Sequence, residues 1–421
     1  MEETKNQAQA YDQEDTLQSF RSKYHIPINE NGKEKIYFCG NSLGLQPKAV
    51  SDAVEEELNN WRTKGVDGHF AEPNPWWTYH KRLKGPLAHI VGAEEHEVVA
   101  MNNLTTNLHL LMASFYRPTA DRYQIMIEGA AFPSDHYAVE SQLRWHGLDP
   151  AQALIELHPP SGEEILRTED IQRAIEQHGD SLAVVLLPGI QYYTGQFFDL
   201  RAITEVAQKL GAKVGFDLAH AVGNVPMQLH DWNVDFAVWC SYKYLNAGPG
   251  NTGGAFVHER YADDPQLPRL AGWWGHREED RFQMKPGFKP MYGVDGWQLS
   301  NANILPLAAQ RVSLEIVADA GMDKIRQKSL KLTGFLEECI RTIDPAQQYI
   351  TIITPEDPEE RGAQLSLVFD SKGKQVFEKL TQSGIIVDWR EPSVIRVAPA
   401  PLYNTFTEVY RFSEILRENL S

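Results

Sequence analysis

The sequence has few cysteines and no segment typical of secretion. Its 421 residues include three cysteines, Cys39, Cys240 and Cys339, which lie far apart in the chain. Three scattered cysteines cannot build the disulfide framework of a small secreted domain, and buried free thiols are the simplest interpretation. The first residues also lack the basic start and the apolar core of a secretory signal. We therefore expect a cytoplasmic protein.

Basic residues are not in excess. The chain has 40 Lys and Arg against 57 Asp and Glu, which gives a formal net charge of -17. Nonspecific binding to nucleic acid or to an anionic membrane depends on clusters of Lys and Arg. No apolar run approaches the roughly 20 residues that span a bilayer. The sequence therefore predicts no nucleic-acid partner and no membrane segment, and any phosphate binding must be local.

Recognisable metal-ligand spacing is also missing. The 14 histidines form no H-E-x-x-H pattern, and no Cys and His residues have the spacing of a zinc site. A metal-dependent hydrolase is therefore disfavoured, and we expect no metal.

The sequence does contain a regular alternation of strand and helix patterns. Apolar runs of strand length occupy residues 123–128, 153–157, 182–187, 212–217, 235–240 and 254–257. Between them, helical patterns that end in a glycine, where a C-terminal cap belongs, occupy residues 136–147, 163–179 and 200–211. This alternation predicts an α/β fold, with a mostly parallel sheet flanked by helices.

The pattern changes after about residue 305. Long helical stretches are followed by the apolar runs QLSLVF, GIIVDW and VIRVAP and by a last helix, which predicts a smaller α+β domain. The polar start of the chain is typical of an arm. We therefore divide the chain into an arm that packs with the small domain (1–50), a large domain (51–305) and a small C-terminal domain (306–421).

The segment SYKYLNAGPGNTGG (241–254) has two interpretations. Gly248, Gly250 and Gly253 satisfy G-x-G-x-x-G, but a dinucleotide site needs a helix after the glycines and an acidic residue about 20 positions further on. Here a strand-like run follows, and aromatic residues stand at 273 and 274. The context therefore disfavours a dinucleotide.

The second interpretation starts from Lys243 and from Asp217, 26 residues earlier. Both follow apolar runs, so both side chains could reach one crevice at the carboxyl edge of the sheet, with His220 close to Asp217. Pyridoxal phosphate needs a lysine for its Schiff base and a carboxylate that keeps its ring nitrogen protonated. Taken singly, the aspartate could be a helix cap and the lysine a surface residue. Together they favour this cofactor.

Longer motifs extend this interpretation over nearly the whole chain. They are YFCGNSLGLQPK (37–48), NNLTTNLHLLMASFY (102–116), AFPSDHYAVESQ (131–142), YYTGQ (192–196), FDLAHAVGN (216–224), CSYKYLNAGPG (240–250), GWWGH (272–276), LSNANIL (299–305) and IRVAPAPLYN (395–404). With these motifs the sequence resembles the kynureninase family, pyridoxal-phosphate enzymes of the aspartate aminotransferase fold type. The resemblance implies hydrolysis of L-kynurenine or 3-hydroxy-L-kynurenine to L-alanine and anthranilate or 3-hydroxyanthranilate, in tryptophan catabolism and NAD biosynthesis.

The resemblance also implies how the cofactor is bound. It makes Lys243 the Schiff-base lysine, Asp217 the partner of the ring nitrogen and His220 a neighbour of the ring. Tyr242 would contact the phosphate, and it is either the proton donor of the late steps or a structural contact. Two further segments match the family. Leu104 and Thr105 match a cofactor-binding turn at a helix N-terminus. Phe132, Pro133, Ser134 and Asp135 match a segment that stacks on the ring and hydrogen-bonds around it.

Substrate binding is implied for three residues. Arg396 would hold the α-carboxylate, although an ion pair within the small domain is an alternative role. His69 would line the aryl pocket, and with Asn301 it resembles the forms that accept the 3-hydroxylated substrate. Trp273 and Asn301 match positions that reach the cofactor or substrate from a second subunit, which implies a homodimer with active sites at the interface. Pro188 replaces a serine of some members, so a polar contact is missing or rerouted there.

Two other functions are disfavoured by the sequence. A desulfurase or selenocysteine lyase of the same fold needs a cysteine on a mobile loop, and none of the three cysteines has that setting. A catalytically silent scaffold is disfavoured because the lysine, the aspartate and the arginine are all present.

Overall fold

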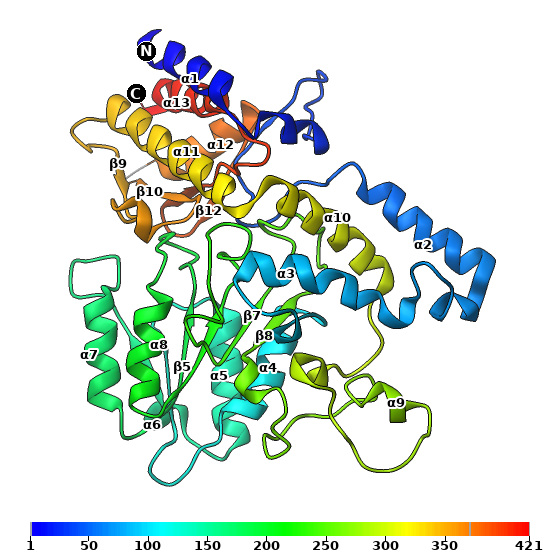
Figure 1. Ribbon diagram of the computed structural model, residues 1–421. Coiled ribbons are helices and arrows are strands. Elements are labelled where there is room, and N and C mark those ends of the chain that lie inside the picture. The colour runs from blue at the N-terminus through cyan, green and yellow to red at the C-terminus, as the bar shows by residue number, and fades with distance from the viewer. Residues whose placement is uncertain (1, 370–371, 421) are drawn as a thin grey trace.

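The computed structural model describes residues 2–369 and 372–420 (Figure 1). The large domain is built on a sheet with the strand order β2-β8-β7-β6-β5-β3-β4. Strands β3 to β7 are parallel, whereas β8 runs antiparallel to both of its neighbours. The strands are β2 (Val98–Ala100), β3 (Gln124–Glu128), β4 (Leu154–Leu157), β5 (Leu182–Pro188), β6 (Lys213–Asp217), β7 (Phe236–Trp239) and β8 (Gly254–Val257). All six runs predicted for this region are strands, and the prediction of a mostly parallel sheet is confirmed.

Alternation along the buried strands divides the large domain into two cores. Ile125 and Ile127 of β3 point to one core, whereas Met126 points to the other. One core lies under α4 (Leu104–Phe115) and α5 (Pro133–Trp145). The other core contains α3 (Lys84–Val91), α7 (Thr168–His178), α8 (Leu200–Lys209) and α10 (Ile304–Ala320). Helices therefore cover both faces of the sheet, as the uninterrupted apolar strands require.

The three glycines predicted to end helices all lie at helix C-termini. Gly147 and Gly211 have φ angles of 75° and 86°, in the left-handed region that favours glycine after a helix. Gly179 is the C-cap residue of α7 and has a φ of -47°, so it ends the helix in a right-handed conformation.

The small domain contains an antiparallel sheet of order β12-β13-β10-β9. Its elements are β9 (Ile350–Ile352), β10 (Leu365–Phe369), β12 (Asp388–Arg390), β13 (Val394–Val397), α11 (Met322–Ile343), α12 (Gly373–Gln382) and α13 (Phe406–Leu420). A short parallel pair joins β1 (Ile36–Tyr37) of the N-terminal segment to β11 (Ile385–Ile386). The side chains of α10 belong to the core of the large domain. The predicted domain boundary at residue 305 stays a prediction, since α10, which lies almost wholly beyond it, packs with the large domain.

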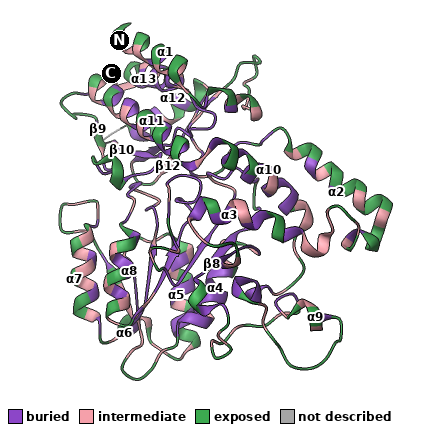
Figure 2. Ribbon diagram, viewed as in Figure 1, coloured by how far each residue is buried: buried purple, intermediate pink, exposed green. Residues whose placement is uncertain are grey.

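The N-terminal helix α1 (Glu2–Glu14) lies beside α13, so the two ends of the described chain are neighbours (Figure 1). The Asp12 carboxylate accepts hydrogen bonds from the backbone N–H groups of Phe406 and Thr407, at 2.7 and 3.0 Å. Asp15 forms a buried ion pair with Lys328 of α11 at 2.7 Å. Figure 2 shows buried residues along the central strands and exposed residues on the outer side of α2 (Val50–Lys64). No helix in the described ranges is both long and apolar enough to cross a membrane.

The Asp12 contact predicts a stability effect. Replacing Asp12 with Ala leaves two N–H groups in the first turn of α13 without their acceptor, and we expect a loss of about 1 kcal/mol in the free energy of unfolding. Chemical denaturation measures it. Asp12→Asn keeps one acceptor oxygen and should lose less, whereas equal unfolding midpoints for Asp12→Ala and the unchanged protein would contradict the capping role.

Candidate active site

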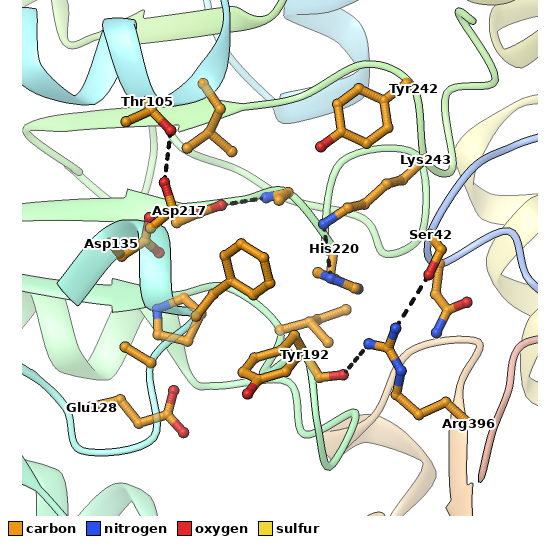
Figure 3. Close-up of a pocket in the computed structure, with 18 of the residues that line it drawn as sticks. Ser42, Thr105, Glu128, Asp135, Tyr192, Asp217, His220, Tyr242, Lys243 and Arg396 are labelled. Carbon is orange, nitrogen blue, oxygen red and sulfur yellow. Dashed lines mark hydrogen bonds between the residues drawn. The ribbon is translucent and has the colours of Figure 1, made fainter. Parts of the chain in front are cut away.

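A cavity of about 260 Å³ lies where the carboxyl ends of the parallel strands meet (Figure 3). Glu128 ends β3, Pro188 ends β5 and Asp217 ends β6, and the last two are directly paired neighbours in the sheet. All three line the cavity. Because parallel strands place their carboxyl ends at one edge, the sheet itself brings these residues together.

Lys243 follows β7 and lies in the same cavity, so the predicted meeting of Lys243 and Asp217 is observed. Its Nζ is 2.9 Å from Nε2 of His220. A lysine ammonium can only donate hydrogen bonds, so His220 accepts through Nε2 and is neutral. Burial and the charge of Lys243 lower the pKa of His220 well below its ordinary value, which agrees with this assignment.

Two carboxyl groups are buried beside each other, one from Asp217 and one from Asp135 in the first turn of α5. The Asp217 carboxylate accepts a hydrogen bond from the backbone N–H of Ala219 at 2.7 Å. Burial raises the pKa of both groups, and the neighbouring Asp217 raises that of Asp135 further. Oδ1 of Asp135 has no hydrogen-bond partner among the described residues. This pair favours the binding of a group that carries a proton and a positive charge.

The N-terminus of α4 forms another wall of the cavity. Asn103 caps this helix by accepting from the N–H of Thr106 at 3.1 Å, and Leu104 and Thr105 line the cavity. The Thr105 hydroxyl is 2.9 Å from the hydroxyl of Ser134. The first N–H groups of a helix and nearby hydroxyls form a suitable place for an anion.

Aromatic side chains complete this end of the cavity. Tyr242 lines it, and burial raises the pKa of the Tyr242 phenol. Phe132 also lines the cavity and has an edge contact with Tyr192, with 5.3 Å between the ring centres. Pro133 is the first residue of α5 and lies outside the set of cavity-lining residues.

Arg396 reaches the cavity from β13 of the small domain. Its side chain is only 1% exposed and forms an ion pair with Asp388. Burial lowers the pKa of Arg396, and Asp388 opposes this effect. The two roles considered for Arg396, cavity residue and partner in an ion pair, are therefore compatible.

Besides Pro133, three predicted site residues do not reach this cavity within one chain. His69 and Trp273 lie in an aromatic cluster, where His69 packs against Trp76 and Trp273 against Trp77, at 5.3 and 6.2 Å between ring centres. Asn301 is exposed in the loop before α10. None of the three is among the residues that line the cavity.

Several cavity residues were not predicted from the sequence. They are Asn41, Ser42, Glu128, Ala131, Ile190, Tyr192, Ala219 and Arg390. Glu128 ends an apolar strand as Asp217 does, so the rule that identified Asp217 could have identified it. Arg390 depends on the register of two small-domain strands, for which the sequence offers no such rule.

One group of possible metal ligands lies elsewhere in the described part of the chain. It contains Glu97, His230 and His258. The Glu97 carboxylate already accepts from His230 and from two backbone N–H groups, and Nδ1 of His258 accepts from the N–H of Arg260. The two imidazoles are stacked, so both cannot direct a lone pair at one ion. We therefore propose no metal at this cluster.

None of the three thiols is suited to be a reactive nucleophile. Burial raises the pKa of Cys39 to about 11, with a further contribution from Asp388. Burial also raises the pKa of Cys240, and that of Cys339 to about 11. All three are therefore protonated at neutral pH.

Glu128 predicts a pH-dependent stability. Burial raises its pKa from 4.5 to about 7, and one of its oxygens has no partner among the described residues. Because the unfolded chain loses this proton first, Glu128 destabilises the fold increasingly between pH 4.5 and 7. The free energy of unfolding of Glu128→Gln should therefore exceed that of the unchanged protein by about 3 kcal/mol at pH 8, with little difference at pH 4. Denaturation at both pH values measures this, and an equal difference at both would contradict it.

Comparisons with known proteins agree with this site and fold. A family model described as the kynureninase C-terminal domain matches residues 325–416. The chain is 50% identical over 414 residues to the kynureninase of Flavobacterium psychrophilum, covering 98% of this chain and 97% of the relative. It is 51% identical over 418 residues to that of Koribacter versatilis, covering 99% and 98%. It is 53% identical over 414 residues to that of Xanthomonas campestris, covering 98% and 97%.

The solved structures that resemble this chain share its fold. A cysteine desulfurase from Thermococcus onnurineus has a TM-score of 0.74 at 17% identity, covering 94% of this chain and 98% of the other. One from Escherichia coli has a TM-score of 0.77 at 17% identity, covering 96% and 98%. These likenesses confirm the predicted fold class. The identity to the curated relatives, over nearly the full length of both chains, shows that this chain belongs to the kynureninase family.

Proposed function

We propose that this protein is a pyridoxal-phosphate-dependent hydrolase that cleaves the bond between the β and γ carbons of L-kynurenine, 3-hydroxy-L-kynurenine or both. The products are L-alanine and anthranilate or 3-hydroxyanthranilate. The observation that carries the proposal is the meeting of Lys243, Asp217 and Arg396 at one cavity. An amine, a carboxylate and a guanidinium are the groups needed for the cofactor, its ring nitrogen and an amino-acid substrate.

The ring end of the cavity fits this cofactor. Asp217 and Asp135 are buried together, the charge of Lys243 only partly offsets the effect of burial on them, and an oxygen of Asp135 lacks any described hydrogen-bond donor. A protonated ring nitrogen offers the missing charge and donor. Asp217 would hold that nitrogen, and Phe132 and Ala219 offer apolar surfaces for the ring.

The N-terminus of α4 fits a phosphate. Leu104 and Thr105 present the first turn of α4, and the hydroxyls of Thr105, Ser134 and Tyr242 are available around it. Such a turn binds a dianion through its N–H groups. Pro188 contributes no hydroxyl and no N–H donor, so the phosphate and ring contacts come from the other walls.

The chain's own residues then have separate roles in the reaction. When bound, pyridoxal phosphate supplies an aldehyde for the amine of Lys243 and for the amine of the substrate, and it also supplies a protonated ring that accepts electrons. Arg396 holds the substrate α-carboxylate, which fixes the α-carbon near Lys243. Lys243 then acts as the base that takes the α-proton. His220, which is neutral, accepts a hydrogen bond from Lys243 and orients it.

Cleavage requires one water molecule and one further proton. Water adds to the ketone carbon of the side chain, the bond between the β and γ carbons breaks, and the γ carbon leaves as the carboxyl group of anthranilate. The β carbon takes up a proton and becomes the methyl group of L-alanine. Tyr242 stays protonated because burial raises its pKa, so it is our candidate donor for this proton.

A second subunit completes the substrate site in this proposal. His69, Trp273 and Asn301 lie outside their own cavity, and the aromatic cluster around two of them exposes Phe70, Trp273 and Phe282 by 61%, 41% and 54%. An exposed aromatic surface of this kind is typical of an interface. We therefore propose a homodimer. From membership of the kynureninase family we further propose that it acts in tryptophan catabolism and NAD biosynthesis, in the cytoplasm.

A desulfurase is the rival within the same fold. That reaction needs a thiolate that receives sulfur, and the three thiols of this chain are buried with raised pKa values. Sulfide release from cysteine, without anthranilate release from kynurenine, would favour this rival.

Lys243→Ala tests the proposed function directly. The unchanged protein, loaded with pyridoxal phosphate, should release anthranilate and L-alanine from L-kynurenine in equal amounts, measured by fluorescence and amino-acid analysis. Lys243→Ala should lose at least about 10³-fold in turnover, because it lacks both the attachment point and the base. Lys209→Ala, at the exposed end of α8, is the matched control and should keep full activity. Full turnover by Lys243→Ala would contradict the proposal.

Mixed dimers test the shared site. Lys243→Ala and Trp273→Ala chains should each be impaired alone, but together they form a hybrid in which one site has both native residues. Activity should therefore rise when the two proteins are unfolded, mixed and refolded. Lys243→Ala mixed with Arg396→Ala is the control and should gain nothing, because both residues serve the same chain's cavity. No gain from the first mixture would contradict a site shared between subunits.

A further inference from the structure

Three charged side chains form one cluster on the small-domain side of the cavity. Asp388 of β12 is paired directly opposite Arg396 of β13 in the antiparallel register. Arg390 lies two residues after Asp388, and alternation along a strand places both on one face of the sheet. Ile395 and Trp389 alternate with them and pack into or against the small-domain core. The sheet therefore builds this cluster on the face that meets the cavity.

Asp388 holds one edge of the Arg396 guanidinium. Nε of Arg396 donates to Oδ2 of Asp388 at 2.5 Å, and Nη2 donates to the same oxygen. The other bonds of the guanidinium go to the carbonyl of Tyr192 from Nη1 at 2.6 Å and to the hydroxyl of Ser42 from Nη2 at 3.2 Å. Figure 3 shows these two terminal nitrogens on the side that faces the cavity, with Nε behind them.

This arrangement leaves the other edge of the guanidinium for a ligand. Arginine binds a carboxylate most strongly when two N–H groups donate in parallel, which requires a fixed plane. Asp388 lies on the Nε edge and so fixes that plane without occupying the edge between the terminal nitrogens. At that edge, the terminal nitrogens of Arg396 have only uncharged partners, the carbonyl of Tyr192 and the hydroxyl of Ser42. A ligand carboxylate would displace these partners or join them.

Charge balance supports the same role. Arg390 also donates from Nε to Oδ2 of Asp388, at 3.0 Å. Two arginines and one aspartate give this cluster a formal charge of +1, which a single carboxylate neutralises. Arg396 is 1% exposed, and a guanidinium so deeply buried needs a fixed anionic partner when no ligand is bound. Asp388 is that partner in the ligand-free protein.

We propose that Asp388 is a positioning residue of the substrate site, which holds Arg396 by its Nε edge so that the two terminal nitrogens bind the α-carboxylate. This inference rests on the proposed function, since that function supplies an amino-acid ligand. Asp388 acts through Arg396 and needs no contact with the substrate.

The test compares two ligands that differ at the carboxylate. L-alanine, the proposed product, carries it, and L-alaninamide replaces it with a neutral group of similar size. Calorimetric titration of the cofactor-loaded protein measures both affinities. We expect the unchanged protein to prefer L-alanine clearly, and Asp388→Ala to lose about tenfold or more of that preference, since a misaligned arginine weakens only the charged ligand.

Kinetics offer a second readout. In Asp388→Ala the KM for L-kynurenine should rise about tenfold while kcat changes less than about threefold, because the carboxylate contact is the same before and during the reaction. Asp388→Asn keeps one acceptor oxygen in place and should lie between the two proteins. It also serves as the test variant if Asp388→Ala does not fold.

Asp344→Asn is the matched control. Asp344 is a buried aspartate of the small domain whose carboxylate accepts from the N–H groups of Gln348, Tyr349 and Ile350, away from the cavity. Its replacement should lower stability and leave the ligand preference unchanged.

Two results would overturn the inference while leaving the proposed function intact. If both ligands weaken equally in the Asp388 variants, the role of Asp388 is merely structural. If the preference for L-alanine grows, Asp388 competes with the ligand instead of orienting its partner. An unchanged protein that releases no anthranilate would instead contradict the proposed function.

Discussion

The structure depends on balancing buried charges at the carboxyl edge of one sheet. Asp135 and Asp217 are buried and Lys243 lines the same cavity, so the charge of each carboxyl group depends on the positive charge beside it. The two carboxyl groups can carry two negative charges, whereas the amine carries one positive charge. A protonated ring nitrogen provides the further proton and positive charge that balance them. This constraint explains why β6 ends in the carboxyl residue Asp217 at the cavity, and why His220 is kept neutral next to the lysine.

A second constraint joins the two domains at the same place. Side chains of the small domain donate to consecutive backbone carbonyls of the large domain: Arg396 and Gln364 to Tyr192, Gln364 and Ser366 to Tyr193, and Thr354 to Thr194. The carbonyls of this loop therefore act as one docking site for the small sheet. The position of the guanidinium is consequently set both by its own domain, through Asp388, and by the loop that lines the cavity.

The sequence predicted much of this arrangement, for identifiable reasons. Runs such as 182–187 are buried on both faces and uninterrupted, so the parallel sheet and the residues at its strand ends followed from local pattern. Glu128 could have been found by the same rule. Asp388 and Arg390 could not, because their roles depend on the register of two strands and on docking between domains. His69, Trp273 and Asn301 came from family motifs alone, and a single chain does not bring them to its own cavity.

The central claim is that the cavity binds pyridoxal phosphate through Lys243. The most direct test is to load the protein with the cofactor, reduce it with borohydride, digest it and locate the modified lysine by mass spectrometry. Reduction makes the link between the cofactor and the lysine permanent, so the label survives digestion. The account predicts one phosphopyridoxyl group per chain, on the peptide that contains Lys243. A label on another lysine, or no label at all, would contradict it.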